Sequence, residues 1–407
     1  LMVLRKGIYG YSSSPYRALL EWAGAEYGDV EKRVREDGLV AALRELREAG
    51  VYITFEEFKG RKPLRRGGRE FPLGPTGFDN PYLKAAYASQ TGGSTGAGTR
   101  VPEDLDHRAA RLPLQKISQH IHGLSETPRA LWRALLPSAI GLNNFITSAV
   151  IGIPPRKWFT PLMANGTRPQ LRYTLANQYV MKVVRLHGVK VPRPEEVPLD
   201  RADIIVRGME QMLREDGSCH VAGGMSLSLR IAVAAREMGV DLTGAVLSGG
   251  GEPPTEAKVA TINSTGARCL QSYYFTEVGA VGLACNNPVD CNDNHFIEDH
   301  LEVLQYPREV EGTGVQVDAF NFTTLLPTAP KLRLNVEIDD YGIIEDRSCG
   351  CPWEELGFKR HVRGLRSFRK LSGEGMTLVG SDMERILDTG LPAKFGGSAQ
   401  DDQLWDA

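Results

Sequence analysis

The stretch Tyr87–Arg100 reads Y-A-S-Q-T-G-G-S-T-G-A-G-T-R and combines four glycines with five Ser or Thr side chains. Glycine lets backbone N–H groups approach an anion closely and tolerates a positive φ. The hydroxyl groups and the fixed charge of Arg100 add further donors, so the stretch suits a loop that wraps a polyphosphate. It matches neither the G-x-x-x-x-G-K-[ST] loop nor the G-x-G-x-x-G turn that opens a Rossmann helix. A flexible Gly/Ser linker is the alternative interpretation.

The segments that follow predict an open α/β sheet with ligands at one edge. Helix and strand patterns alternate from residue 80 onward, which indicates a largely parallel sheet covered on both faces. We expect helices over Asp203–Glu215 and Ser226–Met238 and strands over Ser218–Ala222, Ala245–Leu247 and Arg268–Tyr273. The segments L-S-G-G-G-E-P-P (247–254) and Q-S-Y-Y-F-T-E-V-G (271–279) end or follow predicted strands. Ligands of open α/β sheets bind at the carboxyl ends of the strands.

Other segments support coarser predictions. Val30–Ala49 has helical periodicity, and the apolar stretch Ala139–Ile153 is typical of a buried helix. Residues 60–80 are rich in Gly, Pro and Arg, so we expect a loop there, with the Lys/Arg cluster Lys59–Arg69 facing solvent. A strand-rich region runs from about 281 to 350, with alternating patterns in Glu298–Gln305 and Lys331–Ile338.

Composition limits the classes of function. The chain has 407 residues, of which 42% are hydrophobic and 24% charged, as in a globular protein with more than one subdomain. The net charge of −2 gives no electrostatic basis for binding nucleic acid or an anionic membrane. No apolar run reaches the roughly 18 residues of a membrane span. Six cysteines are too few for a disulfide scaffold in a chain of this size, so we expect a cytoplasmic protein.

The three segments together resemble, in order and rough spacing, the core motifs of the adenylate-forming enzymes: acyl-CoA ligases, adenylation domains and luciferases. In that superfamily a Ser/Thr/Gly loop lies over the ATP β- and γ-phosphates, a G-G-E-P segment borders the adenine, and Y-G-x-[ST]-E follows. The third motif is Tyr273-Tyr274-Phe275-Thr276-Glu277 here, with Tyr274 where glycine is usual. The resemblance implies an α/β fold, the large N-terminal domain of these enzymes, with layered αβαβα sheets and a smaller β subdomain.

A fourth pattern resembles the phenylacetate-CoA ligases and related synthetases. In these enzymes an Asp that binds the ribose precedes a Cys-x-Cys pair by nine residues, as Asp340 precedes Cys349-Gly350-Cys351. They also carry a cysteine before H-I-x-E-D-H, which resembles Cys285 and Cys291 before the segment His295–His300. The resemblance runs from about residue 80 to the C-terminus.

The resemblance and the chemistry of adenylation assign the site residues. An adenylating enzyme brings a carboxylate to the ATP α-phosphate and stabilises the charge on a pentavalent phosphorus. Glu277 would bind Mg²⁺ and Thr276 would donate to the α-phosphate. Asp340 would accept hydrogen bonds from the ribose hydroxyls, and Asp339 is the main alternative for this role. A turn before Tyr341, with no role in binding, is the alternative interpretation of both residues. The remaining nucleotide-binding residues are Ser89, Thr91, Gly92, Gly93, Ser94, Thr95, Gly96, Gly250, Gly251, Glu252, Pro253, Tyr273 and Tyr274.

Weaker assignments concern the acyl pocket. Phe145, His220, Gly223 and Gly224 are candidates for substrate binding, although His220 is equally well a core histidine. His120 and His122 are expected at the surface, and Cys219 and Cys269 in the core.

The other cysteines indicate a metal. Two thiolate pairs from distant segments can form a tetrahedral structural zinc site that closes a loop-rich region. Four buried free thiols are the alternative. The candidate ligands are any four of Cys285, Cys291, His295, Cys349 and Cys351. His300 is assigned to a hydrogen bond at a strand end.

The predicted organisation has four parts: an N-terminal helical and loop segment (1–80), an α/β nucleotide- and acyl-binding core (81–280), a β-rich subdomain with the zinc site (281–362), and a hinge with the start of a truncated C-terminal domain (363–407). The resemblance implies that most of a mobile C-terminal domain, including its catalytic lysine, is absent from this chain.

The predicted function is ATP-dependent adenylation of a carboxylic acid, releasing pyrophosphate. The subgroup implies an aromatic acid and subsequent formation of a CoA thioester. Two alternatives stay open: adenylation with an amine, carrier-protein or nitrogen-oxyanion acceptor, and nucleotide binding without turnover. The expected partners are ATP, Mg²⁺, structural Zn²⁺, a small-molecule carboxylic acid and CoA or another acceptor, with no nucleic acid and no membrane. A homodimer is also left open.

Overall fold

The structure is a computed structural model. It describes residues 1–74, 76–90, 100–136, 138–161, 171–186, 188–252, 254–275, 277–310, 314–368, 372–373, 376–377 and 394.

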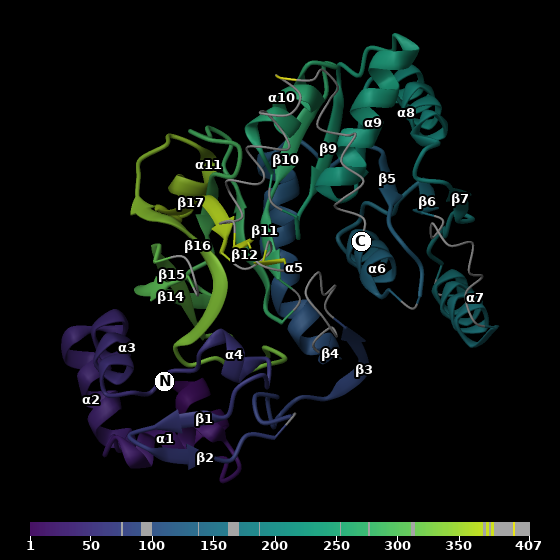
Figure 1. Ribbon diagram of the computed structural model, residues 1–407. Coiled ribbons are helices and arrows are strands. Elements are labelled where there is room, and N and C mark those ends of the chain that lie inside the picture. The colour runs from purple at the N-terminus through teal and green to yellow at the C-terminus, as the bar shows by residue number, and fades with distance from the viewer. Residues whose placement is uncertain are drawn as a thin grey trace.

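A six-stranded parallel sheet lies at the centre of the α/β part, with the strand order β10-β9-β8-β5-β6-β7 (Figure 1). The strands are β5 (Arg129–Trp132), β6 (Lys157–Pro161), β7 (Glu195–Val197), β8 (Cys219–Ala222), β9 (Ala245–Gly249) and β10 (Arg268–Gln271). The accompanying helices are α6 (Ile140–Val150), α7 (Leu171–Leu186), α8 (Ala202–Asp216), α9 (Met225–Met238) and α10 (Glu256–Asn263). All neighbouring strands pair in parallel.

Both faces of this sheet are covered, because successive strand residues point to opposite faces. In β5, Ala130 and Trp132 pack with α8, α9 and α10, whereas Leu131 packs with Phe145 of α6 and Met181 of α7. Such strands have no polar face, which explains why β5 is buried along its whole length. The predicted doubly covered parallel sheet is therefore confirmed.

A seven-stranded antiparallel sheet lies beside it, in the order β11-β12-β13-β17-β16-β15-β14 (Figure 1). The strands are β11 (Tyr273–Phe275), β12 (Gly279–Ala284), β13 (Asn294–Phe296), β14 (Leu301–Glu309), β15 (Gln316–Thr324), β16 (Val336–Asp346) and β17 (Arg360–Ser367), with the short helix α11 (Pro352–Glu355) before β17. Its core includes Phe296, Phe320 and Phe322.

The N-terminal segment packs against this antiparallel sheet. It comprises η1 (Val3–Tyr9), α1 (Pro15–Trp22), α2 (Tyr27–Asp37), α3 (Leu39–Glu48), α4 (Phe55–Phe58), β1 (Leu64–Arg66) and β2 (Arg69–Phe71). Its apolar side chains form one core with Leu304, Leu332 and Val336. The Asn335 amide also donates to the Leu43 carbonyl at 2.8 Å. These contacts determine where α4 lies relative to the candidate site.

Two paired strands, β3 (Ala85–Gln90) and β4 (Arg100–Asp104), flank the Gly/Ser/Thr stretch and lead into α5 (Leu105–Ile121). Asp104 caps α5, since its carboxylate accepts from the Asp106 backbone N–H at 2.6 Å. Two short strands, β18 (Ser372–Gly373) and β19 (Met376–Thr377), pair near the C-terminus. Of the helices that the structure describes, none combines the length and apolarity that a membrane crossing requires.

Several sequence-based expectations were wrong in detail. The predicted helix Val30–Ala49 is two helices, because Gly38 between them has φ 88°. The predicted loop 60–80 contains the hairpin β1–β2. The strand expected over Lys331–Ile338 begins only at Val336, after Asn335 with φ 50°. The helix expected to be buried over Ala139–Ile153 exposes Ile140 and Val150 at its two ends.

Two further corrections concern the surroundings of the site. The strand predicted over Arg268–Tyr273 is divided at Ser272, so that β10 belongs to the parallel sheet and β11 to the antiparallel sheet. His122, expected at the surface, is buried, and its Nε2 lies 3.1 Å from the Ala284 carbonyl. The contact joins the end of α5 to β12, 162 residues away, and no local pattern reports it.

Candidate functional site

The second and third motifs meet at the carboxyl edge of the parallel sheet. Gly250 follows β9, and a Cβ atom there would lie 2.7 Å from the Ser272 carbonyl and 2.9 Å from the Tyr274 ring. A side chain at position 250 would therefore displace the third motif. Gly251 has φ 88°, a conformation that glycine adopts without strain. These contacts explain the need for glycine at both positions.

Glu252 has a structural partner that the sequence did not indicate. Its carboxylate accepts from the Ser226 backbone N–H at 2.8 Å and from the Ser226 hydroxyl at 2.5 Å. Ser226 lies in the first turn of α9, where a carboxylate satisfies N–H groups and interacts favourably with the helix dipole. A Cβ at Gly224 would lie 2.5 Å from a Glu252 oxygen, so Gly224 leaves room for this contact.

Tyr273 and Asp340 connect the third and fourth motifs across 67 residues. The Tyr273 hydroxyl donates to Asp340 Oδ2 at 2.7 Å. Burial and the Asp340 carboxylate raise the Tyr273 pKa well above its usual value, so the phenol keeps its proton and remains a donor. Asp339 instead accepts from the Ser367 hydroxyl at 3.3 Å. The geometry thus favours Asp340 over Asp339 as the acid beside the Tyr-Tyr-Phe-Thr-Glu motif.

Glu277 is a buried, ionised carboxylate, 4% exposed. Its Oε1 lies 3.4 Å from Lys59 Nζ and 3.8 Å from Arg333 Nη2. Burial alone would raise the Glu277 pKa, but Arg333 and Lys59 together lower it below its ordinary value. Mg²⁺ at phosphate-binding sites usually takes one or two carboxylates plus phosphate oxygens. Glu277 is an ionised carboxylate, and its role as a Mg²⁺ ligand stays a prediction.

Arg333 and Lys59 were not identified by sequence reasoning. Arg333 is 2% exposed, and its guanidinium carbon lies 4.6 Å from the Phe58 ring centre and 4.8 Å from the Phe275 ring centre. Its Nε and Nη1 have no hydrogen-bond partner within the described part of the chain. Lys59, expected to face solvent, follows α4, and packing of the N-terminal segment brings it to Glu277. No local signal at position 59 indicates a contact 218 residues away.

Part of the predicted site lies outside the described residues: Thr91, Gly92, Gly93, Ser94, Thr95, Gly96, Pro253 and Thr276. The flanking strands are described, with Ser89 in β3 paired to Val101 in β4. Arg100 Nη1 donates to Asp79 at 2.9 Å. The first motif thus begins in β3 and ends at the start of β4, and phosphate binding by the residues between these strands stays a prediction.

Two weak candidates for the acyl pocket lie inside the fold. Phe145 is 1% exposed and stacks on Trp158, with ring centres 5.4 Å apart. His220 is buried in β8, where its Nδ1 accepts from Arg129 Nε at 3.2 Å and its Nε2 lies 2.6 Å from the Ser248 hydroxyl. Burial and then Arg129 lower the His220 pKa well below its ordinary value. Gly223, by contrast, lies at the carboxyl edge, directly after β8.

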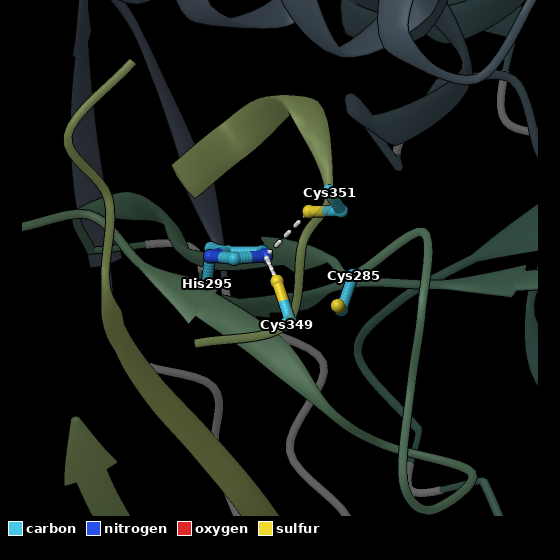
Figure 2. Close-up of side chains that lie close together, drawn as sticks. All are labelled: Cys285, His295, Cys349 and Cys351. Carbon is cyan, nitrogen blue, oxygen red and sulfur yellow. Dashed lines mark hydrogen bonds between the residues drawn. The ribbon is translucent and has the colours of Figure 1, made fainter. Parts of the chain in front are cut away.

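Four of the five candidate metal ligands converge (Figure 2). The ligand atoms of Cys285, His295, Cys349 and Cys351 all lie within 4.8 Å of one another. His295 Nε2 is 3.0 Å from the Cys351 sulfur and 3.6 Å from the Cys349 sulfur. Cys291 lies outside this group, since its sulfur contacts the Pro254 carbonyl at 3.5 Å. The four converging residues are called the Cys/His cluster below.

The orientation of His295 suits a metal ligand. Its Nδ1 lies 2.8 Å from the Phe358 carbonyl, so Nδ1 carries the proton and Nε2 presents its lone pair to the sulfurs. Burial and then the adjacent His361 lower the His295 pKa to about 4, which keeps the ring neutral at pH 7. Histidine ligands of metals commonly donate their second ring N–H to a carbonyl in this way. The donor set, three sulfurs and one nitrogen, fits a tetrahedral structural zinc site.

Comparison with known proteins gives a likeness in structure. No protein-family model matches the chain, and no curated protein does. The chain aligns over 93% of its length with 76% of 2-hydroxyisobutyryl-CoA ligase in an open conformation with 2-HIB-AMP and CoA, at a TM-score of 0.53 and 12% identity. The same ligase in its postadenylation state with 2-HIB-AMP aligns with 92% of this chain over 68% of the ligase chain, at a TM-score of 0.52 and 13% identity. At this identity the likeness establishes the fold alone, and it confirms the predicted fold class.

Proposed function

We propose that this chain, which has the fold of the adenylate-forming acyl-CoA ligases, catalyses ATP-dependent adenylation of a carboxylic acid with release of pyrophosphate. The observation that carries the proposal is the convergence of three motifs. Gly250 packs on Tyr274, Tyr273 donates to Asp340, and the ionised Glu277 follows in the same motif. In the proposal these groups serve the adenine, the ribose and the metal. Gly250 follows β9 at the carboxyl edge of the parallel sheet, where ligands of such sheets bind.

Each group has a distinct task in the proposed reaction. Asp340, oriented by the Tyr273 hydroxyl, accepts from the ribose hydroxyls and so orients the sugar. Glu277 binds Mg²⁺, which supplies positive charge beside the phosphates. Lys59 and Arg333 keep Glu277 ionised in the absence of the metal. The donors for the β- and γ-phosphates are proposed from sequence to be the Gly/Ser/Thr stretch, and Thr276 to be the donor to the α-phosphate.

The identities of the acid and the acceptor are finer parts of the proposal. An aromatic acid and a CoA acceptor rest on the resemblance to phenylacetate-CoA ligases. The structurally similar 2-hydroxyisobutyryl-CoA ligase was captured with an acyl adenylate and CoA, which supports the same two-step chemistry in this fold. An amine, carrier-protein or nitrogen-oxyanion acceptor is the alternative, and it would use the same adenylation step.

We also propose that the Cys/His cluster binds one structural Zn²⁺. Burial raises the Cys285 pKa, so this thiol stays protonated unless a cation stabilises the thiolate. A zinc ion would connect the end of β12, β13 and the loop before α11. The most distant ligands in sequence, Cys285 and Cys351, are 66 residues apart. All four positions would be filled by protein, as in structural rather than catalytic zinc sites.

Pyrophosphate release tests the main proposal. The chain is mixed with Mg²⁺, ATP and a panel of aromatic and aliphatic carboxylic acids, and the acyl adenylate is detected by mass spectrometry. We expect acid-dependent pyrophosphate release that Glu277→Gln abolishes. ATP binding without pyrophosphate release for any acid in the panel would favour a nucleotide-binding protein without turnover. Adding CoA then separates thioester formation from transfer to another acceptor.

A further inference from the structure

Arg133 is a partly buried arginine at the carboxyl edge of the parallel sheet. It follows β5 directly, and its Nη2 donates to the Gly223 carbonyl, which follows the adjacent β8. No salt bridge joins Arg133 to a carboxylate in the part of the chain that the structure describes, and its Nε has no hydrogen-bond partner there. Burial lowers the Arg133 pKa to about 10, so the side chain is still charged at neutral pH. A partly buried charge whose only side-chain partner among the described residues is a carbonyl is costly unless it has a role.

The acidic group that influences Arg133 is Glu252, which partly offsets the effect of burial. Its carboxylate is already bound to the N–H and hydroxyl groups of Ser226 at the start of α9. Glu252 therefore contributes a favourable field without forming a salt bridge to Arg133. An anion bound from outside would give the guanidinium the charged partner that the described residues do not provide.

The order of the strands separates the backbone position of Arg133 from those of Gly250 and Tyr273. The order β10-β9-β8-β5 puts Arg133 two strands from Gly250, which follows β9. It is three strands from β10, which leads to Tyr273. Neighbouring strands are about 4.8 Å apart, so these backbone separations are about 10 Å and about 14 Å. The Arg133 side chain spans one such strand-to-strand interval to reach Gly223. Glu277, the proposed metal ligand beside the ATP phosphates, follows β11 of the antiparallel sheet, whereas Arg133 follows β5 inside the parallel sheet.

We propose that Arg133 binds an anionic group at the end of the acid substrate that is remote from the reacting carboxylate, and that the substrates are dicarboxylic acids. This inference rests on the proposed adenylation activity and specifies its substrate class. The planar guanidinium accommodates a carboxylate through two parallel N–H···O bonds. One carboxylate of the diacid reacts at the nucleotide end, and the other remains ionised and pairs with Arg133.

Matched pairs of acids test the proposal by pyrophosphate release. Terephthalate is compared with 4-methylbenzoate, and 1,4-phenylenediacetate with 4-methylphenylacetate. We expect the wild-type chain to prefer the diacid of each pair. Arg133→Met should lower kcat/KM for the diacids by about 10- to 100-fold, the value of a charge-assisted hydrogen bond, mainly through KM. It should change kcat/KM for the monoacids by less than about threefold, and Arg133→Lys should retain part of the preference.

Two controls separate a binding role from a structural one. Arg156→Met removes an exposed arginine before β6, at the opposite edge of the sheet, where it pairs with Asp216. This variant should leave the ratio between diacid and monoacid unchanged. Thermal unfolding of each variant checks the fold, and calorimetric titration of terephthalate without ATP measures binding independently of turnover.

The outcomes distinguish this inference from the proposed function. If the wild-type chain adenylates monoacids as well as diacids, or if Arg133→Met lowers both equally, the inference is wrong while the adenylation activity stands. If the wild-type chain binds terephthalate through Arg133 but releases no pyrophosphate with any acid, the proposed function fails and the anion site remains. Binding of terephthalate that is equal in the wild type and in Arg133→Met would also overturn the inference.

Discussion

Replacing Glu277 by glutamine should reduce stability as well as activity. The Glu277 side chain neutralises Arg333, which is 2% exposed and lies between two aromatic rings. Breaking a buried ion pair by removing one partner typically costs about 3–5 kcal/mol, because the other charge is left buried. The pair here is 3.8 Å apart, and a glutamine oxygen can still accept a hydrogen bond. We therefore expect a destabilisation at or just below the lower end of this range, about 2–3 kcal/mol. Lys59 adds little, since its side chain is 23% exposed and can turn to water.

The double variant Glu277→Gln, Arg333→Met separates stability from catalysis. Removing both buried charges and filling the space with an apolar side chain should recover most of the lost stability, because neither charge is left unpaired. Adenylation should not recover, since the carboxylate proposed to bind Mg²⁺ is still missing. Lys59→Met alone should change stability by less than about 1 kcal/mol, as for other partly exposed ion pairs.

Urea unfolding at pH 7, together with pyrophosphate release, measures both properties. A double variant no more stable than Glu277→Gln would refute the account of the buried pair. A double variant that releases pyrophosphate at the wild-type rate would refute the assignment of Glu277 as metal ligand. The pH dependence gives a further check. Because the Glu277 pKa is lowered in the folded state, its contribution is present above the ordinary carboxyl pKa and is lost as the pH falls through the folded value.

Three other predictions concern the Cys/His cluster, Asp340 and His107. Elemental analysis should find one zinc ion per chain. The variant Cys351→Ser should lose the zinc and unfold at a lower urea concentration, whereas Cys291→Ser should keep the zinc, because Cys291 lies outside the Cys/His cluster. Wild-type protein that contains no zinc would contradict the proposed zinc site. Asp340→Asn should raise the KM for ATP by about 10-fold or more, and Asp339→Asn by less than about threefold; equal effects in steady-state assays would remove the distinction between them. His107 is a buried residue in the first turn of α5. Burial and then Arg111 lower the His107 pKa to about 3, so the neutral ring contributes stability above its unfolded pKa of about 6.5. That contribution is lost as the pH falls from about 6.5 toward 3, by up to about 1.4 kcal/mol per pH unit, and His107→Gln should flatten this slope in unfolding experiments.

The elements of the α/β part could be predicted closely from sequence. The helix expected over Asp203–Glu215 is observed over Ala202–Asp216, and the strand expected over Ser218–Ala222 over Cys219–Ala222. In both cases local properties decide the outcome: the apolar periodicity of the helix, its terminal glycine, and a short apolar run before Gly223. Boundaries were missed where tertiary contacts decide them, as at Ser272, where one predicted strand becomes part of two sheets.

The candidate site was predictable to the extent that its chemistry lies in short contiguous motifs. Glycines at 250 and 251, the Tyr-Tyr-Phe-Thr-Glu run and the Cys-x-Cys pair are legible in order along the chain, because each one reflects a local backbone or ligand requirement. The residues that these motifs contact in the fold cannot be predicted from local sequence in the same way. Asp340 was favoured over Asp339 by spacing, but only the Tyr273 hydrogen bond gives a physical reason for the choice.

The sequence by itself therefore determined the fold class, the order of the motifs and the types of residue in the site, since hydrophobic periodicity and local motif chemistry are properties of neighbouring residues. Only the tertiary structure decided that Lys59 and Arg333 flank Glu277, that Cys291 lies outside the Cys/His cluster, and that Arg133 lies beside Gly223 without a carboxylate partner among the described residues. These contacts join segments as many as 218 residues apart. They arise from the packing of the N-terminal segment and the two sheets, and no local pattern specifies which distant charges that packing brings together.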